Sequence, residues 1–95
     1  MKPRITINAR TDGEFELWLN EEGRDLLVRE LLNLDEGRDH FHMAAPECGR
    51  AEIELSLRPY RETDKLFSTG KVMLRTDEWD RTYFPHVMTG EHMSD

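Results

Sequence analysis

The segment NEEGRDLLVRELLNLDEG, residues 20–37, decides the fold that this sequence predicts. Leucines and one valine recur in it every three or four residues, which places them on one side of an α-helix. Asn20 is a residue type that caps helix N-termini, and Gly37 is one that commonly ends helices in the left-handed conformation. We therefore predict one amphipathic helix between these two residues.

The apolar side of this helix is expected to supply most of its stability. Gly23, in the first turn, costs about 1 kcal/mol relative to alanine, so burial of the apolar side must hold the helix in place. Glu30 falls on the opposite side, which is expected to face solvent. The apolar side is formed by Leu26, Leu27, Val28, Leu31, Leu32 and Leu34.

Polar and apolar residues alternate in strand-like fashion before the helix. Residues 5–9 and 15–19 alternate on either side of Thr11-Asp12-Gly13, which is a turn-forming sequence. We predict an antiparallel hairpin here. Its buried face is expected to carry Ile5, Ile7, Ala9, Phe15, Leu17 and Leu19.

The same alternation resumes after the helix. Residues 40–43 and 52–58 alternate around a break at residues 46–49, so we predict a second hairpin that mirrors the first. A polar loop at residues 59–69 then leads into a last strand at residues 71–75.

Five strands and one amphipathic helix predict an α+β domain. We expect a two-layer sandwich of order ββαβββ, in which the helix packs on the apolar face of a mostly antiparallel sheet and the polar face meets solvent. A chain of 95 residues is long enough for one such core. We place this single domain at residues 1–87 and predict that residues 88–95, which are poor in apolar surface, form a disordered tail.

The charge of the chain restricts its partners. A formal net charge of -7 disfavours nucleic acid and anionic membrane surfaces, because neither presents the opposite sign. The natural complement is a basic protein. No apolar run is long enough for a signal peptide or a membrane span, which predicts a cytoplasmic protein. Cys48 is the only cysteine, and its neighbours are typical of a turn, so we interpret it as an ordinary loop thiol.

The polar face of the predicted sheet carries the candidate site. His40 and His42 share a face of one strand and could supply two metal ligands, but no further ligand follows at a binding spacing. Glu52 and Glu54 would lie on the same open face, where little burial is available to shift a carboxyl pKa for catalysis. We therefore predict no catalytic residue, no metal and no cofactor. The predicted partner-binding residues are Glu14, Glu16, Trp18, His40, His42, Glu52 and Glu54.

Trp18 is out of phase with the apolar residues of its strand and is expected to point to the polar side of the sheet. Exposed aromatic residues are enriched at interfaces, which favours a partner site. Alternatively, Trp18 packs beneath the C-terminal segment, whose Trp79, Tyr83 and Phe84 need a surface to cover. We favour this second interpretation.

Three groups of residues resemble a family of small bacterial immunity proteins from polymorphic toxin systems. They are the run Asn20-Glu21-Glu22-Gly23 with the leucines that follow it, the run His40-Phe41-His42-Met43, and the strand from Ala51 to Leu55. The resemblance covers residues 13–58. It implies a non-catalytic inhibitor that binds a cognate toxin made by the same cell.

Three functions are therefore open at the level of sequence. The first is a protein-binding module of the immunity type that neutralises a basic toxin domain through an acidic sheet face. The alternative is a homodimeric structural or adaptor domain, in which sheet edges or the surface around Trp18 pair with a second copy. The third is a metal protein or enzyme that uses His40 and His42.

Overall fold

The computed structural model of the protein describes residues 2–89. Secondary structure begins three residues into this range and continues to its end. The elements are β1 (Ile5–Ala9), β2 (Phe15–Leu19), α1 (Glu21–Leu32), β3 (His40–Ala44), the 3-10 turn η1 (Pro46–Cys48), β4 (Ile53–Glu54), β5 (Lys65–Leu66), β6 (Thr69–Met73), α2 (Asp77–Tyr83) and α3 (Pro85–Thr89).

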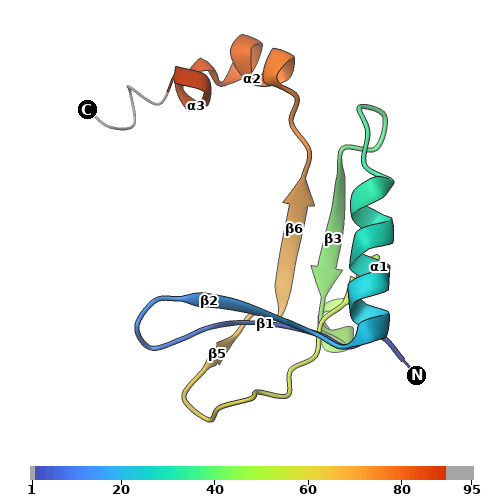
Figure 1. The fold of residues 1–95 in the computed structure, drawn as a ribbon, viewed down its shortest axis with the longest axis vertical. Helices are drawn as coiled ribbons and strands as arrows, with labels where there is room; N and C mark the ends of the chain where they lie inside the picture. Colours follow the sequence, from blue (N-terminus) through green and yellow to red (C-terminus); the bar gives the residue numbers. More distant parts are fainter. Residues whose placement is uncertain (1, 90–95) are drawn as a thin grey trace.

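The fold is of the α+β class, as the sequence predicts, and its strands form two small sheets instead of one. One sheet has the order β2-β1-β5 and the other the order β4-β3-β6. Figure 1 shows the β1–β2 hairpin running across one end of the second sheet, with α1 beside β3. The additional strand, β5, lies within the segment predicted to be a polar loop. Within residues 2–89, no helix is both long and apolar enough to cross a bilayer.

The first hairpin is confirmed. β1 and β2 pair antiparallel, with a register that runs from Ile5 opposite Leu19 to Ala9 opposite Phe15. The turn is closed by the backbone N–H of Arg10, which donates to the carbonyl of Glu14. Gly13 has a φ of 92°, a value that glycine adopts without steric cost, which explains its place in this turn.

The prediction of a second hairpin is wrong. β3 and β4 run parallel, with Met43 opposite Ile53, and the antiparallel neighbour of β3 is β6. Between β3 and β4 the chain passes through η1 and an irregular segment. It then re-enters the sheet running in the same direction as β3. A tight turn would have reversed the direction of the chain. The longer connection lets β4 align parallel to β3 instead.

Helix α1 starts as predicted and ends earlier than predicted. The side chain of Asn20 accepts a hydrogen bond from the Gly23 N–H at 2.7 Å, which makes Asn20 the N-cap. The helix ends at Leu32 and not near Gly37. Asp35 instead accepts the N–H groups of Gly37 and Arg38 at 2.8 Å, and so closes a separate turn. A carboxylate is unfavourable at the negative end of a helix dipole and favourable in such a turn.

The buried side of α1 is rotated from the predicted one. Gly23 and Glu30 are buried, and Leu31 and Leu32 are exposed. Glu30 is tolerated inside because Arg38 donates a hydrogen bond to its carboxylate at 2.7 Å, which pairs the charge. The residues of α1 and the following turn that face inward therefore recur at helical spacing, namely Gly23, Leu26, Leu27, Glu30 and Leu34.

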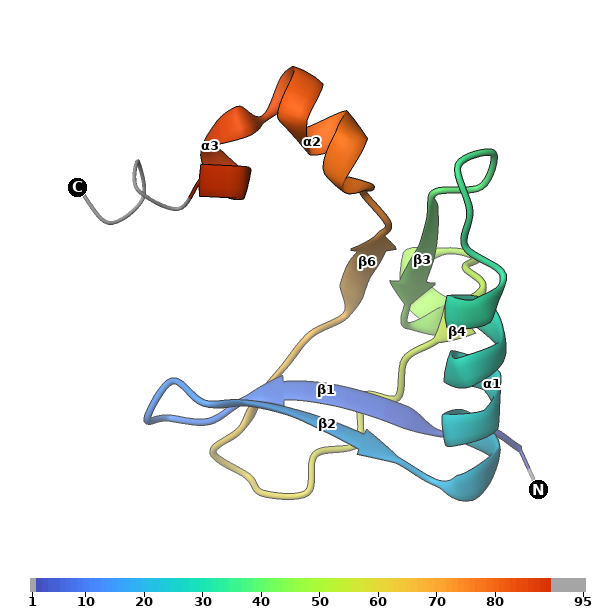
Figure 2. The same cartoon turned by 45° about the horizontal axis from the view of Figure 1, so that its top comes forward.

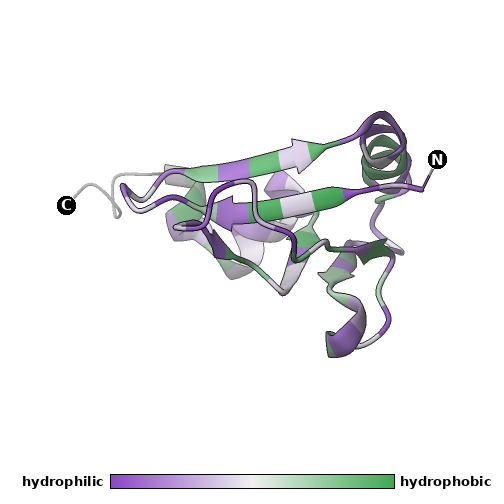
Figure 3. Ribbon diagram, turned by 90° about the horizontal axis from the view of Figure 1, so that it is seen from below, coloured by the Kyte–Doolittle hydropathy of each residue, from purple (hydrophilic) through white to green (hydrophobic). Residues whose placement is uncertain are grey.

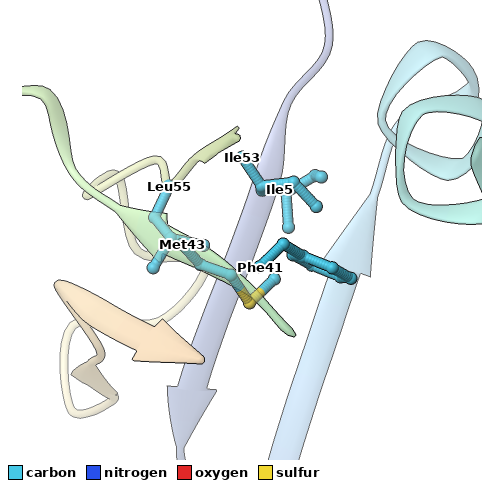
Figure 4. Packing of buried hydrophobic residues seen from close by; sticks show 5 residues of the cluster. All are labelled: Ile5, Phe41, Met43, Ile53 and Leu55. Carbon is cyan, nitrogen blue, oxygen red and sulfur yellow. The ribbon is translucent and has the colours of Figure 1, made fainter. Parts of the chain in front are cut away.

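The hydrophobic core lies where α1, the second sheet and the start of β1 meet. Five residues form its centre, and each is at most 5% exposed. Figure 4 shows these side chains gathered between β3 and β1. They are Ile5, Phe41, Met43, Ile53 and Leu55. Alternation along β3 and β4 predicted the inward direction of Phe41, Met43, Ile53 and Leu55 correctly.

Gly23 is required by the close approach of α1 to β1. A Cβ atom at this position would lie 2.6 Å from the carbonyl oxygen of Arg4 and 2.9 Å from Cγ1 of Ile5. We expect Gly23→Ala to lower the free energy of unfolding by about 1–3 kcal/mol, because the backbone of β1 must shift. This cost exceeds the gain in helix propensity of about 1 kcal/mol. Urea denaturation measures the difference.

Gly37→Ala is the matched control for this substitution. A Cβ atom on Gly37 would meet its nearest atom, in the side chain of Asp35, at an ordinary 3.5 Å. We expect its effect to stay within about 0.5 kcal/mol. A Gly23→Ala protein as stable as the wild type would show that α1 can move away from β1 freely.

Helices α2 and α3 form a C-terminal arm, residues 77–89. Figures 1 and 2 show the arm beyond the end of β6, at the opposite end of that strand from the hairpin. Met88 and Thr89, which the sequence places in the tail, belong to α3. Residues 90–95 of the predicted tail lie outside the described part of the chain.

Candidate functional site

The seven predicted partner-binding residues lie on two different sheets. Glu16 and Trp18 are on β2, with Glu14 directly before it, and the remaining four residues are on β3 and β4 or directly before β4. The predicted site required one continuous polar face, and it is divided because the strands form two sheets. The two groups have different surroundings.

Trp18 is covered by the chain, and the segment that covers it is not the predicted one. Its ring stacks on that of Tyr60, with centroids 4.0 Å apart and an angle of 13° between the rings. Its Nε1–H donates to Oδ1 of Asn8 at 2.8 Å, and the guanidinium of Arg61 lies 5.7 Å from the ring centroid. The prediction that the C-terminal segment covers Trp18 is wrong, because Trp79 in that segment packs against Tyr83.

Glu16 belongs to the same covered cluster. Its carboxylate accepts a hydrogen bond from Nδ2 of Asn8 at 3.1 Å and is ion-paired with Arg61 and with Arg10. The hydrogen bond from Asn8, followed by the charge of Arg61, lowers the pKa of Glu16 below its usual value of 4.5. Glu14 is exposed in the turn and lies 3.8 Å from Arg10. These contacts give Glu14, Glu16 and Trp18 structural roles in the hairpin.

The other four residues share one exposed surface, the outer face of the sheet β4-β3-β6. In the register of β3 with β6, His40 lies opposite Met73 and His42 opposite Lys71. The rings of His40 and His42 meet edge to face, with centroids 5.0 Å apart. We call this surface the histidine face and define it as His40, His42, Glu52, Glu54, Lys71 and Met73, all of which are exposed.

Lys71 and Met73 were missed as members of this surface. Alternation along residues 71–75 places both on one side of their strand, so their direction was available from the sequence. What the pattern does not reveal is that β6 pairs with β3. Residues directly opposite each other in an antiparallel pair share a face, so this pairing brings the two side chains beside His40 and His42.

Two carboxylates hold the histidine face in place. Glu52 accepts the backbone N–H of His42 at 2.8 Å, and this hydrogen bond lowers the pKa of the Glu52 carboxyl. The carboxylate of Asp39 lies 2.9 Å from Nδ1 of His40 and accepts from Nη1 of Arg75 at 2.9 Å. The hydrogen bond with His40, followed by the charge of Arg75, lowers the pKa of Asp39.

The possible metal ligands of the histidine face are few. Among residues 2–89, no group of three or more His, Cys, Asp or Glu side chains is placed to hold a metal ion. His40 and His42 therefore have no third ligand in this range. Cys48 is exposed on η1. An open sheet face without water exclusion also lacks the environment in which acid–base groups are strongly perturbed.

The lowered pKa values predict that acid destabilises the protein. Glu16 and Glu52 release their protons more readily when folded than when unfolded, so the unfolded state binds more protons in the acidic range. The stabilisation is fully present above about pH 4.5, the usual pKa of glutamate, and is lost as pH falls through the lower folded pKa values. Urea midpoints measured against pH test this. The double substitution Glu16→Gln and Glu52→Gln should reduce the dependence of the urea midpoint on pH. A wild-type midpoint that does not change with pH in the acidic range would contradict the prediction.

A second exposed surface is apolar and contradicts a prediction. Phe15, Leu17 and Leu19 of β2 are 63%, 39% and 38% exposed, although the sequence predicts that they are buried. On the opposite side of the hairpin, Thr6 and Asn8 are each only 1% exposed. The polar face of the hairpin is therefore covered, whereas the apolar face is buried at Ile5, which is 1% exposed, and open along β2. Figure 3 shows the alternation of hydrophilic and hydrophobic residues along both strands.

Comparison of the chain with protein-family models, with curated proteins and with solved structures finds no match.

Proposed function

We propose that this protein is a non-catalytic protein-binding module of the immunity type, which neutralises a basic toxin domain in the cytoplasm of the cell that makes both. The histidine face is the contact surface. The observation that carries the proposal is that all six of its side chains are exposed while Glu52 and Asp39 hold its backbone and His40 in place. A surface ordered in advance loses less conformational entropy on binding. The resemblance to small immunity proteins supplies the class of partner.

The charge of the chain supports a basic partner. Toxin domains that act on nucleic acid require basic clefts, and a net charge of -7 would accelerate association with such a cleft. On the histidine face, Glu52 and Glu54 supply negative charge, and the two imidazoles supply hydrogen-bonding groups. Of the seven residues predicted from the sequence, the proposal retains His40, His42, Glu52 and Glu54.

The proposal predicts that a gene for a large secreted toxin lies beside the gene for this protein, and sequencing the neighbouring genes tests this. The probe for binding is the purified C-terminal domain of that predicted toxin. Wild-type protein is expected to bind it and to bind more weakly as salt rises, because exposed charges are screened. The double variant His42→Ala and Glu54→Lys should weaken binding about tenfold or more. Isothermal titration calorimetry at low and high salt measures both effects.

Glu36→Lys is the matched control, because it makes the same charge reversal at an exposed residue outside the histidine face. It should leave the affinity within about threefold of the wild type, a difference of less than 1 kcal/mol. If the double variant binds as tightly as this control, the histidine face is not the contact surface. If the wild type does not bind the neighbouring domain, the immunity function is refuted.

A separate observation, the exposed apolar surface of the hairpin, favours the homodimeric alternative. It concerns how copies of the chain assemble, and it leaves the histidine face available for a partner.

A further inference from the structure

Two apolar surfaces of the chain are left uncovered. The first is the outward face of the sheet β2-β1-β5. In its register, Ile7 lies opposite Leu17, Ala9 lies opposite Phe15, and the N–H of Phe67 donates to the carbonyl of Ile7. We call this surface the apolar hairpin face and define it as the exposed residues Phe15, Leu17, Leu19 and Phe67 with the half-buried Ala9 beside them. Ile7 lies on the same side but is partly buried against the core.

The second apolar surface is the C-terminal arm. Its large side chains are between 37% and 60% exposed, although they are aromatic or aliphatic. They are Trp79, Tyr83, Phe84, Val87 and Met88. Helices as short as α2 and α3 are not stable in water alone and need packing on an apolar face. The arm therefore requires a surface of the kind that the hairpin offers.

The direction of the arm is fixed at its base by Asp39. The backbone carbonyl of Asp39 accepts the N–H of Leu74 at 2.7 Å, and its carboxylate accepts from Arg75 at 2.9 Å. The guanidinium of Arg75 also lies 5.1 Å from the ring centroid of Trp79. Turning the arm back toward the hairpin of its own chain would separate Trp79 from Arg75. The hairpin of another copy can meet the arm without separating them.

The exposed area is sufficient for a stable interface. Five aromatic side chains on the two surfaces, each carrying about 150–250 Å², together expose on the order of 500 Å². The exposed aliphatic residues of both surfaces bring the total close to the roughly 800 Å² per partner of a standard interface. The aromatic residues are Phe15, Phe67, Trp79, Tyr83 and Phe84.

Charge at the edges of the two surfaces is also complementary. The arm begins with Asp77, Glu78 and Asp80, so its first turn is strongly acidic. Lys65 lies opposite Ala9 in the register of β5 with β1, which places this lysine on the apolar hairpin face, and it is exposed. An arm on this face would bring the acidic turn of one chain within range of a lysine of the other.

We propose that the protein is a homodimer in which the C-terminal arm of each copy packs on the apolar hairpin face of the other. Each chain gives one arm and receives one arm, so a single two-fold axis satisfies both surfaces and closes the assembly. The histidine faces remain outside this interface. The dimer would thus carry two partner-binding surfaces.

Sedimentation equilibrium of the full chain tests the dimer, with an expected mass of twice 11.2 kDa. Leu17→Glu on the hairpin and Phe84→Glu on the arm should each raise the dimer dissociation constant at least about tenfold, because a carboxylate would be buried among apolar groups. Phe84 lies outside the core, so its substitution tests the interface even if Leu17→Glu disturbs folding. Leu32→Glu, at a leucine that is 79% exposed on α1, is the matched control and should remain dimeric.

Cross-linking between two differently tagged chains tests whether the arm of one copy packs on the hairpin of the other. Both chains carry Cys48→Ser, one also carries Phe15→Cys, and the other carries Val87→Cys. A bismaleimide should join the two tags, and Leu32→Cys in place of Phe15→Cys should abolish the product. A wild-type monomer at the highest attainable concentration overturns the proposal. A dimer that both glutamate variants leave intact overturns it equally, and neither result depends on the toxin partner.

Discussion

Replacing Phe41 with alanine is expected to lower the free energy of unfolding by about 3–5 kcal/mol. Phe41 is 0% exposed and is the largest side chain in the core. Its removal takes apolar surface out of the interior and leaves a cavity that the strands of the small second sheet cannot close. Domains of this size are stable by only about 5–15 kcal/mol, so the loss is a large part of the total.

His42→Ala is the control for Phe41→Ala. His42 is the next residue on the same strand, and its side chain points to the opposite, exposed face. Its substitution should change the stability by less than about 1 kcal/mol. Urea denaturation at one fixed protein concentration compares the two variants. If Phe41→Ala cost no more than His42→Ala, the core would not be centred on β3.

Replacing Trp18 with alanine should cost about 2–4 kcal/mol, although this residue lies on the side that the sequence marks as polar. The substitution removes the ring on which Tyr60 stacks and the N–H that satisfies Asn8. Asn8 is 1% exposed, so its freed carbonyl oxygen would lose a partner that water replaces poorly. Thermal and urea unfolding measure the loss.

Two conservative variants separate the contributions of Trp18. Trp18→Phe keeps an aromatic ring beneath Tyr60 but removes the hydrogen bond to Asn8 and part of the stacking area, so its cost should lie between that of Trp18→Ala and zero. Tyr60→Phe keeps the stack and should be nearly neutral, because only the hydroxyl is lost. A Trp18→Ala protein of wild-type stability would mean that residues 59–64 do not cover the hairpin in solution.

Local features of the fold were predictable because their causes are local. Asn20 caps α1 through a hydrogen bond that spans three residues, and the hairpin turn at Gly13 uses a conformation suited to glycine. The α+β class follows from the same short-range patterns. The inward direction of Phe41 and Met43 also follows from alternation on β3.

The pairing partners of β3 were not predictable, because alternation has the same period in parallel and antiparallel strands. Nothing in the alternation of residues 52–58 shows whether this segment pairs with β3 in the antiparallel or in the parallel direction. The division into two sheets has the same origin. β5 has only two residues, Lys65 and Leu66, and its pairing with β1 depends on a contact far apart in the sequence.

The burial of Ile5 was predicted correctly, but the covering of the polar face of the hairpin was not, because polarity does not decide burial when polar groups find partners. The side chain of Asn8 accepts a hydrogen bond from Trp18 and donates one to Glu16, and Arg61 forms an ion pair with Glu16. Because these polar groups have partners, residues 59–64 can lie over the polar face at little cost. The candidate site changed for the same reason. Trp18 and Glu16 are half-buried beneath Tyr60 and Arg61 and are not part of an open partner surface.

The connection between β5 and β6 has a mechanical consequence. Two residues, Phe67 and Ser68, separate β5 of one sheet from β6 of the other. The N–H of Phe67 donates to the carbonyl of Ile7, and the carbonyl of Ser68 accepts from the N–H of Ala45. Two residues span at most about 7 Å, so a displacement of one sheet must also displace the other. The amide protons of Phe67 and Ala45 should exchange with deuterium at a common rate, as parts of one cooperative unit.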